Sequence, residues 1–119
     1  MLGVAGLLHG RQASTHWAYH GLLPLVGAQP IAGRVVRDGK IITGGGVTAG
    51  IDFALVLAAE LAGVEAAKTI QLALEYNPEP PYQSGTPVQA PKNIHKNLCN
   101  FYAPKITAFE KDLKNAMAR

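Results

Sequence analysis

One apolar stretch constrains the fold more than any other part of this 119-residue chain. Residues 47–62 read VTAGIDFALVLAAELA and carry polar side chains only at Thr48, Asp52 and Glu60. Three consecutive glycines precede the stretch and one glycine follows it. A helix that is apolar on nearly every other side is normally buried against other elements. The pattern therefore predicts a buried helix after a Gly-rich turn, inside a layered domain.

The clearest short-range signal is a β-hairpin directly before this helix. Two runs containing β-branched residues, 31–37 and 40–43, flank the dipeptide Asp38-Gly39. Asp-Gly between such runs is a strong two-residue turn signature, because the turn needs positive φ at its centre. We therefore expect Asp38 and Gly39 to form the turn.

The remaining chain predicts strands alternating with helices. Leu2 to Leu8 suggests the end of a small-residue helix closed by Gly10, and the stretch after Asn77 is too rich in proline for regular structure. The other expected elements are a short strand at 11–15, a helix at 17–26 bent by Gly21 and Pro24, an amphipathic helix at 65–76 and a helical tail at 92–119 broken before Pro104. This order is typical of an α/β domain.

Charge and composition exclude several classes of function. Residues 1–91 carry five basic and six acidic side chains, whereas the stretch from Lys92 carries six basic and two. Nucleic-acid binders show a denser basic stripe, so a solvated amphipathic helix is favoured and no nucleic-acid partner is expected. The apolar stretch is too short and interrupted to span a membrane. With one cysteine, Cys99, and no signal-peptide pattern, a soluble cytoplasmic protein is expected.

Three groups of residues are candidates for chemistry. His16 and His20 are four residues apart, a spacing that on a helix can hold a metal, but no Glu follows His16 and structural roles are favoured. Gly44, Gly45 and Gly46 before a helix can expose amides to an anion or simply allow close packing, and both readings stay open. Cys99 has no feature that would activate a nucleophile, so a half-buried structural thiol is favoured.

A longer resemblance is carried by four stretches. They are LGVAGLLHGRQASTHW at 2–17, RVVRDG at 34–39, ITGGGVTAGIDFA at 42–54 and QLALEYNPEPP at 71–81. Together they resemble the ThiJ/PfpI superfamily, and most closely its isonitrile-hydrating members, from Leu2 to about Pro91. The amidase-like domains of AraC-type transcription regulators share much of the pattern. The tail matches poorly, and Cys99 is not a family position.

The resemblance implies the C-terminal half of a flavodoxin-like three-layer sandwich, in a protein that is usually a homodimer and needs no metal or organic cofactor. Residues 1–91 would form a partial family domain and 92–119 an amphipathic tail. The family's catalytic cysteine would lie about five residues before Met1, on a strand-to-helix elbow, and an acidic partner would lie earlier still. This chain would then hold pocket-lining residues and no catalytic ones. The expected pocket-lining residues are Thr15, His16, Trp17, Gly44, Gly45, Gly46, Val47 and Thr48.

The activity implied is hydration of an isonitrile to an N-substituted formamide by a cysteine thiolate, with the chain inactive alone. The alternatives are the ligand-sensing domain of an AraC-type regulator and a non-catalytic remnant. A parallel sheet without its first half would expose a strand edge and apolar helix faces, so we expect the isolated chain to aggregate, swap or oligomerise.

Overall fold

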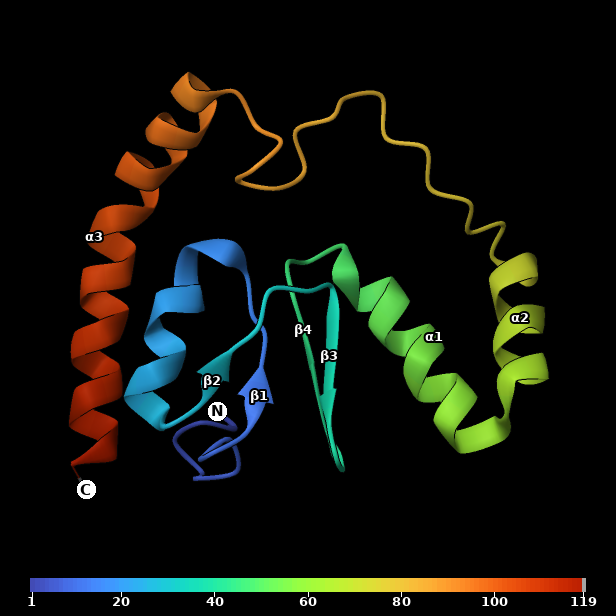
Figure 1. The fold of residues 1–119 in the computed structure, drawn as a ribbon, viewed down its shortest axis with the longest axis horizontal. Coiled ribbons are helices and arrows are strands. Elements are labelled where there is room, and N and C mark those ends of the chain that lie inside the picture. Colours follow the sequence, from blue (N-terminus) through green and yellow to red (C-terminus); the bar gives the residue numbers. More distant parts are fainter. Residues whose placement is uncertain (119) are drawn as a thin grey trace.

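The computed structural model describes residues 1–118. The molecule is a thin slab of 44 × 37 × 17 Å (Figure 1). The chain combines strands with helices, which confirms the expected α/β class, although three strands in a row precede the three α-helices. Arg119, the last residue of the expected tail helix, lies outside the described residues. The elements are β1 (Gln12–Ala13), the 3₁₀ helix η1 (Trp17–Val26), β2 (Gln29–Pro30), β3 (Val35–Asp38), β4 (Ile41–Gly44), α1 (Ala49–Ala62), α2 (Val64–Ala73) and α3 (Lys92–Met117).

The strands form two small sheets that side chains connect. β1 pairs with β2 in parallel, and β3 pairs with β4 in antiparallel orientation. Between the sheets, the backbone N–H of Gln12 donates to Asp38 Oδ2 at 2.8 Å. The N–H of Ser14 likewise donates to Thr43 Oγ1 at 2.9 Å. Both Ser14 and Thr43 are buried. The hairpin is thus fixed against β1 without a backbone ladder.

The hairpin is confirmed, but its turn is shifted by one residue from the expected position. Asp38 pairs with Ile41, so Gly39 and Lys40, rather than Asp38 and Gly39, occupy the centre of the turn. Gly39 has φ +61°, and Lys40 is not among the residues with positive φ. A turn with positive φ only at its first central position needs glycine there. Asp38 is left in the strand, where its carboxylate accepts from Arg11 and Gln12.

Two expected helices take a different local form. Residues 2–8 form successive turns rather than an α-helix, with Gly6 N–H donating to Gly3 C=O and Leu7 N–H to Leu2 C=O. Two glycines in so short a segment lower its helix propensity, by about 1 kcal/mol each relative to alanine. The helix at 17–26 has the expected bounds but is 3₁₀, with Pro24 inside it. Proline lacks the N–H that a continuous α-helix would use there.

The hydrophobic core lies at one side of the slab. It combines residues of the first thirty positions with one residue of α3, and Tyr19, Ile41 and Ile106 pack against it. We call this part, residues 1–30 with α3, the core region. The buried apolar members are Leu8, Ala13, Leu22, Leu23, Val26, Ala28 and Leu113.

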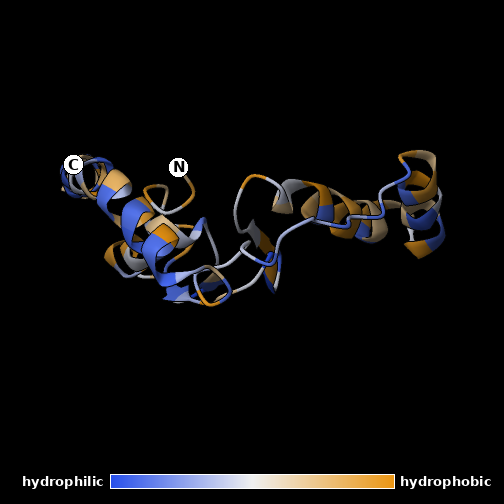
Figure 2. Cartoon of the chain, turned by 90° about the horizontal axis from the view of Figure 1, so that it is seen from above, coloured by the Kyte–Doolittle hydropathy of each residue, from blue (hydrophilic) through white to orange (hydrophobic). Residues whose placement is uncertain are grey.

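The helices α1 and α2 form an arm on the opposite side of the hairpin (Figures 1 and 2). The expectation that α1 is buried is wrong for the described chain: Ala49 is its only buried residue, and Leu61 is 79% exposed. The physical reason is that α1 contacts α2, β3 and β4 but no layer on its remaining faces. In Figure 2 much of the ribbon of this arm has the colour of hydrophobic residues.

The tail is one uninterrupted helix, so the expected break before Pro104 is wrong. Pro104 costs one backbone hydrogen bond. Packing on both sides of the proline offsets that cost: the ring of Tyr19 lies 6.0 Å from that of Tyr102 and 5.8 Å from that of Phe109. α3 therefore lies along η1, as Figure 1 shows. A long loop over residues 74–91 returns the chain from the arm to α3.

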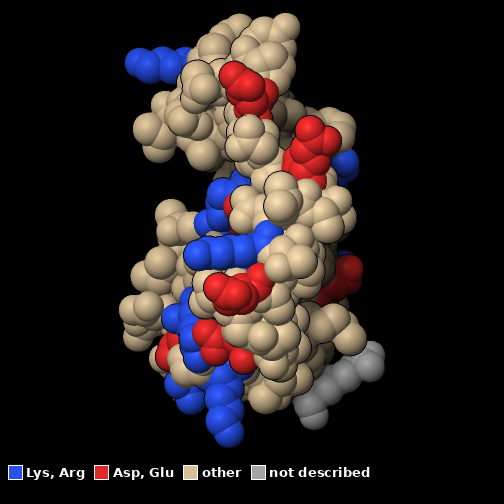
Figure 3. Space-filling model, turned by 90° about the vertical axis from the view of Figure 1, so that its right-hand side faces the viewer, with Lys and Arg blue, Asp and Glu red and all other residues tan. Residues whose placement is uncertain are grey.

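Charged side chains are dispersed rather than grouped by sign on the face seen in Figure 3. Two ion pairs connect β3 to neighbouring parts of the chain. Arg37 pairs with Glu60 of α1, and Arg11 pairs with Asp38 at 3.2 Å. Within residues 1–118, no helix is both long enough and apolar enough to cross a bilayer.

Candidate functional site

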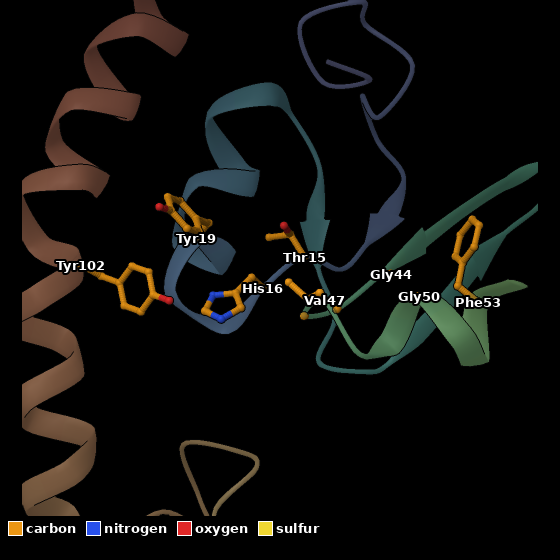
Figure 4. Close-up of a pocket in the computed structure, with 10 residues that line it drawn as sticks. Thr15, His16, Tyr19, Gly44, Val47, Gly50, Phe53 and Tyr102 are labelled. Atoms are coloured by element: carbon orange, nitrogen blue, oxygen red, sulfur yellow. The ribbon is translucent and has the colours of Figure 1, made fainter. Parts of the chain in front are cut away.

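An open cavity of about 570 Å³ lies where three parts of the chain meet (Figure 4). The β1–η1 junction supplies one side, the turn from β4 into α1 supplies another, and α3 supplies a single residue. Its size is within the range of small-molecule sites. The lining residues are Thr15, His16, Tyr19, Gly44, Gly45, Gly46, Val47, Gly50, Phe53 and Tyr102.

Six of the eight residues expected to line a pocket contribute to this cavity, and two do not. Trp17 instead packs its ring against those of His95, at 5.4 Å, and Tyr102, at 5.7 Å. Thr48 uses its carbonyl to accept a hydrogen bond from Arg34 Nη2 at 3.0 Å. The six that line the cavity are Thr15, His16, Gly44, Gly45, Gly46 and Val47.

His16 is the best-oriented polar side chain of the cavity. It caps η1, with its Nδ1 accepting from the backbone N–H of Ala18 at 3.3 Å. A neutral imidazole that accepts at Nδ1 carries its proton on Nε2. The Cδ2 edge beside Nε2 faces Gly46, where an added Cβ would lie 3.4 Å from Cδ2. His16 can therefore offer an Nε2–H donor to a ligand.

The three glycines bring the backbone of the turn close to the hairpin. The N–H of Gly45 donates to Arg34 C=O at 2.9 Å, and a Cβ added at Gly45 would lie 3.0 Å from Gly33 O. This geometry supports close packing as one role of the glycines. Within residues 1–118, the amides of Gly46 and Val47 have no acceptor, and they precede the N-terminus of α1. Anion binding at these amides stays a prediction.

A network of Arg34, Asp52 and Tyr76 fixes the start of α1 beside the cavity. Tyr76 OH donates to Asp52 Oδ1 at 2.6 Å, and Arg34 Nε donates to Asp52 Oδ2. The Tyr76 hydrogen bond, followed by that of Arg34, lowers the pKa of Asp52, and Asp52 in turn raises the pKa of Tyr76 and of Arg34. Asp52 thus has a defined structural role rather than that of an ordinary helix-surface residue.

The two histidines with metal-type spacing have separate partners. His20 Nε2 lies 3.1 Å from Ile31 C=O, whereas His16 faces the cavity. Among the described residues, no group of three His, Cys, Asp or Glu side chains is placed to hold a metal. The pair therefore does not form a ligand set by itself.

Cys99 is exposed on α3, so the expectation of a half-buried thiol is wrong, and it does not line the cavity. Its Sγ lies 3.4 Å from Nε2 of His95, one helical turn earlier. The four-residue spacing of His95 and Cys99 was visible in the sequence, but the tail had no family motif to draw attention to it.

Sequence reasoning missed four lining residues: Tyr19, Gly50, Phe53 and Tyr102. Phe53 and Gly50 lie within the family-like stretch 42–54, so that stretch was the available signal. Tyr102 had no such signal, because the tail sequence matches the family poorly. Its place in the cavity follows from the docking of α3 on η1.

Three comparisons relate this chain to known proteins. Residues 1–60 match the DJ-1/PfpI family. An isonitrile hydratase of Pseudomonas putida is 57% identical over 106 residues, which are 89% of this chain and 46% of that protein. The crystal structure of a ThiJ/PfpI family protein from Pseudomonas syringae is 40% identical and superposes with a TM-score of 0.87 over 99% of this chain and 47% of the other. The chain therefore spans about half the length of these relatives, and the structural match includes α3.

Proposed function

Because this chain belongs to the DJ-1/PfpI family, we propose that it is part of an isonitrile hydratase. The similarity to the Pseudomonas putida enzyme supports an enzyme over a ligand-sensing domain. We further propose that the complete protein is a flavodoxin-like sandwich that acts as a homodimer, with this chain forming its C-terminal half. Its nucleophilic cysteine would lie on an elbow about five residues before Met1, as the family resemblance implies.

The observation that carries this proposal is the donor arrangement in the cavity. His16 offers Nε2–H, and the amides of Gly46 and Val47 offer two further donors at the start of α1. Donors fixed before the reaction stabilise charge that develops in a transition state. These groups can bind a substrate that becomes more negative at nitrogen or oxygen as it reacts.

The proposed reaction adds water across the terminal carbon of an isonitrile. The cysteine thiolate adds to that carbon, which takes a proton, and a thioimidate forms. Water then adds to the same carbon, and one of its protons goes to the nitrogen. The sulfur leaves with its electron pair as the C=O bond forms, and the remaining proton of the water is released, which replaces the one that the carbon took up. The product is an N-substituted formamide. In this scheme His16 Nε2–H donates a hydrogen bond to the nitrogen, and the Gly46 and Val47 amides stabilise the oxygen that water brings.

Cys99 has no place in this mechanism. It is exposed, it lies outside the cavity lining, and its contact is with His95 rather than with His16. The proposal therefore assigns the chemistry to a different thiol and leaves Cys99 as a residue of the helix surface.

The test is an isonitrile hydration assay on the complete protein, with formation of N-cyclohexylformamide from cyclohexyl isonitrile followed by NMR. We expect His16→Ala to lower kcat by about 10²-fold, the range of a lost donor to charge that develops in the transition state. His20→Ala is the matched control, because His20 bonds Ile31 outside the cavity lining. It should retain wild-type activity.

A second variant separates the two thiols. Cys99→Ser should hydrate the isonitrile at the wild-type rate. Loss of activity in Cys99→Ser, or no hydration by the wild-type protein, would overturn the proposal.

A further inference from the structure

Tyr102 is the only residue of α3 that lines the cavity. The other lining residues come from the β1–η1 junction, η1, and the turn and first helix after β4. In Figure 4 its side chain extends from α3 toward His16, with the hydroxyl at the near end. The wall of the cavity formed by α3 is therefore a single aromatic side chain.

The ring of Tyr102 is held in place by its aromatic neighbours. Its centroid lies 5.4 Å from that of His16, and the rings of Trp17 and Tyr19 contact it at 5.7 and 6.0 Å with near-perpendicular planes. Phe101 completes the set at 5.3 Å. Edge-to-face packing of this kind fixes ring orientation. The Tyr102 ring is a preformed surface rather than a mobile one.

The shape of an isonitrile determines which part of it Tyr102 would meet. The group C–N≡C is linear, so the substituent on nitrogen extends directly away from the reacting carbon. The donors that would hold the reacting end lie on His16 and on the Gly46–Val47 turn. Figure 4 places Tyr102 on the opposite side of His16 from that turn. The substituent is thus the part of the substrate that reaches α3.

On the basis of the proposed function, we propose that Tyr102 is a specificity-determining residue that selects isonitriles with an aromatic N-substituent. The ring offers edge-to-face stacking, which a saturated substituent of the same size cannot reciprocate. Phenyl-bearing isonitriles form the substrate class that this wall would favour.

The experiment compares benzyl isonitrile with cyclohexylmethyl isonitrile, which have similar size and differ in aromaticity. For the complete wild-type protein we expect kcat/KM to be about 5-fold higher for benzyl isonitrile, the factor that corresponds to one aromatic pair. Tyr102→Leu should remove this preference, so that the two substrates have equal kcat/KM. Tyr102→Phe should keep the preference, because the ring remains.

Phe101→Leu is the matched structural control. Phe101 does not line the cavity, and Tyr102 keeps its contacts with His16, Trp17 and Tyr19 when Phe101 is replaced, so the preference should be retained in this variant. A preference that persists in Tyr102→Leu, or that disappears in Phe101→Leu as well, would overturn the proposal.

A binding measurement keeps this test separate from the proposed function. Trp17 is the only tryptophan and packs against Tyr102, so its fluorescence reports binding beside this ring. N-benzylformamide should bind the wild-type protein about 5-fold more tightly than N-cyclohexylmethylformamide, and equally tightly in Tyr102→Leu. If no isonitrile is hydrated, the proposed reaction fails while this difference still supports Tyr102. Equal binding by the wild-type protein would contradict the role of Tyr102 in either case.

Discussion

The core region and the arm are both mainly helical, yet they differ in what surrounds their apolar side chains. In the core region, Leu22, Leu23 and Val26 of η1 are each less than 9% exposed. In the arm, α1 and α2 each bury one alanine and leave most of their large apolar residues open. The 3₁₀ helix with an internal proline is thus better buried than the more regular α-helix.

This contrast shows that local helix formation and burial are separate properties of a segment. α1 forms because its residues favour a helix and a glycine stands at its C-cap. Its apolar faces need a covering layer that residues 1–118 do not provide. Exposed apolar surface of this extent is typical of an interaction surface. The expected aggregation or oligomerisation of the isolated chain therefore stays a prediction, and the arm is the part that would cause it.

The largest difference between the two regions should appear on truncation of a leucine in each. Leu23→Ala removes a side chain that is 8% exposed and should lower the free energy of unfolding by about 2–3 kcal/mol. Leu72→Ala, at 82% exposure, should change it by no more than about 0.5 kcal/mol. Urea denaturation followed by circular dichroism measures both. Equal losses would show that the arm is packed as tightly as the core region.

A smaller effect is expected where the hairpin meets the arm. Gly45→Ala should destabilise the chain by about 1–2 kcal/mol, because the new Cβ would lie 3.0 Å from the carbonyl oxygen of Gly33. Gly50→Ala is the matched control inside α1, where nothing lies within 4 Å of the added Cβ. Gly50→Ala should raise the free energy of unfolding by up to about 1 kcal/mol. Destabilisation by both changes would mean that α1 does not tolerate added side chains for a reason other than contact.

The smallest effect concerns the polar network that ties α1 to the end of the arm. Tyr76 and Arg34 lower the pKa of Asp52 below its ordinary value of 3.8. A carboxyl group with a lowered pKa in the folded state stabilises the fold above its unfolded pKa, and this stabilisation is lost as the pH falls. Unfolding measured between about pH 5 and about pH 2 should therefore show a weaker pH dependence in Tyr76→Phe than in the wild-type chain.

Tyr82→Phe is the control for this prediction. Tyr82 is an exposed tyrosine of the loop and makes no hydrogen bond among the described residues. The Tyr82→Phe substitution should leave the pH dependence of unfolding unchanged. An identical pH profile for Tyr76→Phe and Tyr82→Phe would indicate that the Tyr76 hydroxyl does not lower the pKa of Asp52.

Much of the fold could be predicted from residue patterns, because it depends on local chemistry. The hairpin followed from Asp-Gly between β-branched runs, and the loop after Asn77 followed from its prolines. Burial could not be predicted in the same way. The apolar pattern of α1 indicates that the helix needs cover, but not whether cover is present in the same stretch of chain.

The residues of the site show the same difference between local patterns and long-range contacts. Thr15, His16 and the Gly44–Val47 turn belong to motifs that are continuous in sequence, and the structure brings them together in one cavity. Tyr102 reaches that cavity through the docking of α3 on η1, where its ring packs against that of Tyr19. No local pattern predicts such a contact, since it joins residues about eighty positions apart in the chain.

The side chains that connect the two sheets have a consequence for how this chain can associate with others. A free strand edge is a template for adding another strand, and from there for fibril growth. The N–H groups of Gln12, in β1, and of Ser14, directly after it, already donate to Asp38 and Thr43. An incoming strand would find these donors already used. The hairpin thus covers the donors on this edge of β1, and a strand that adds to the molecule would have to pair at another edge.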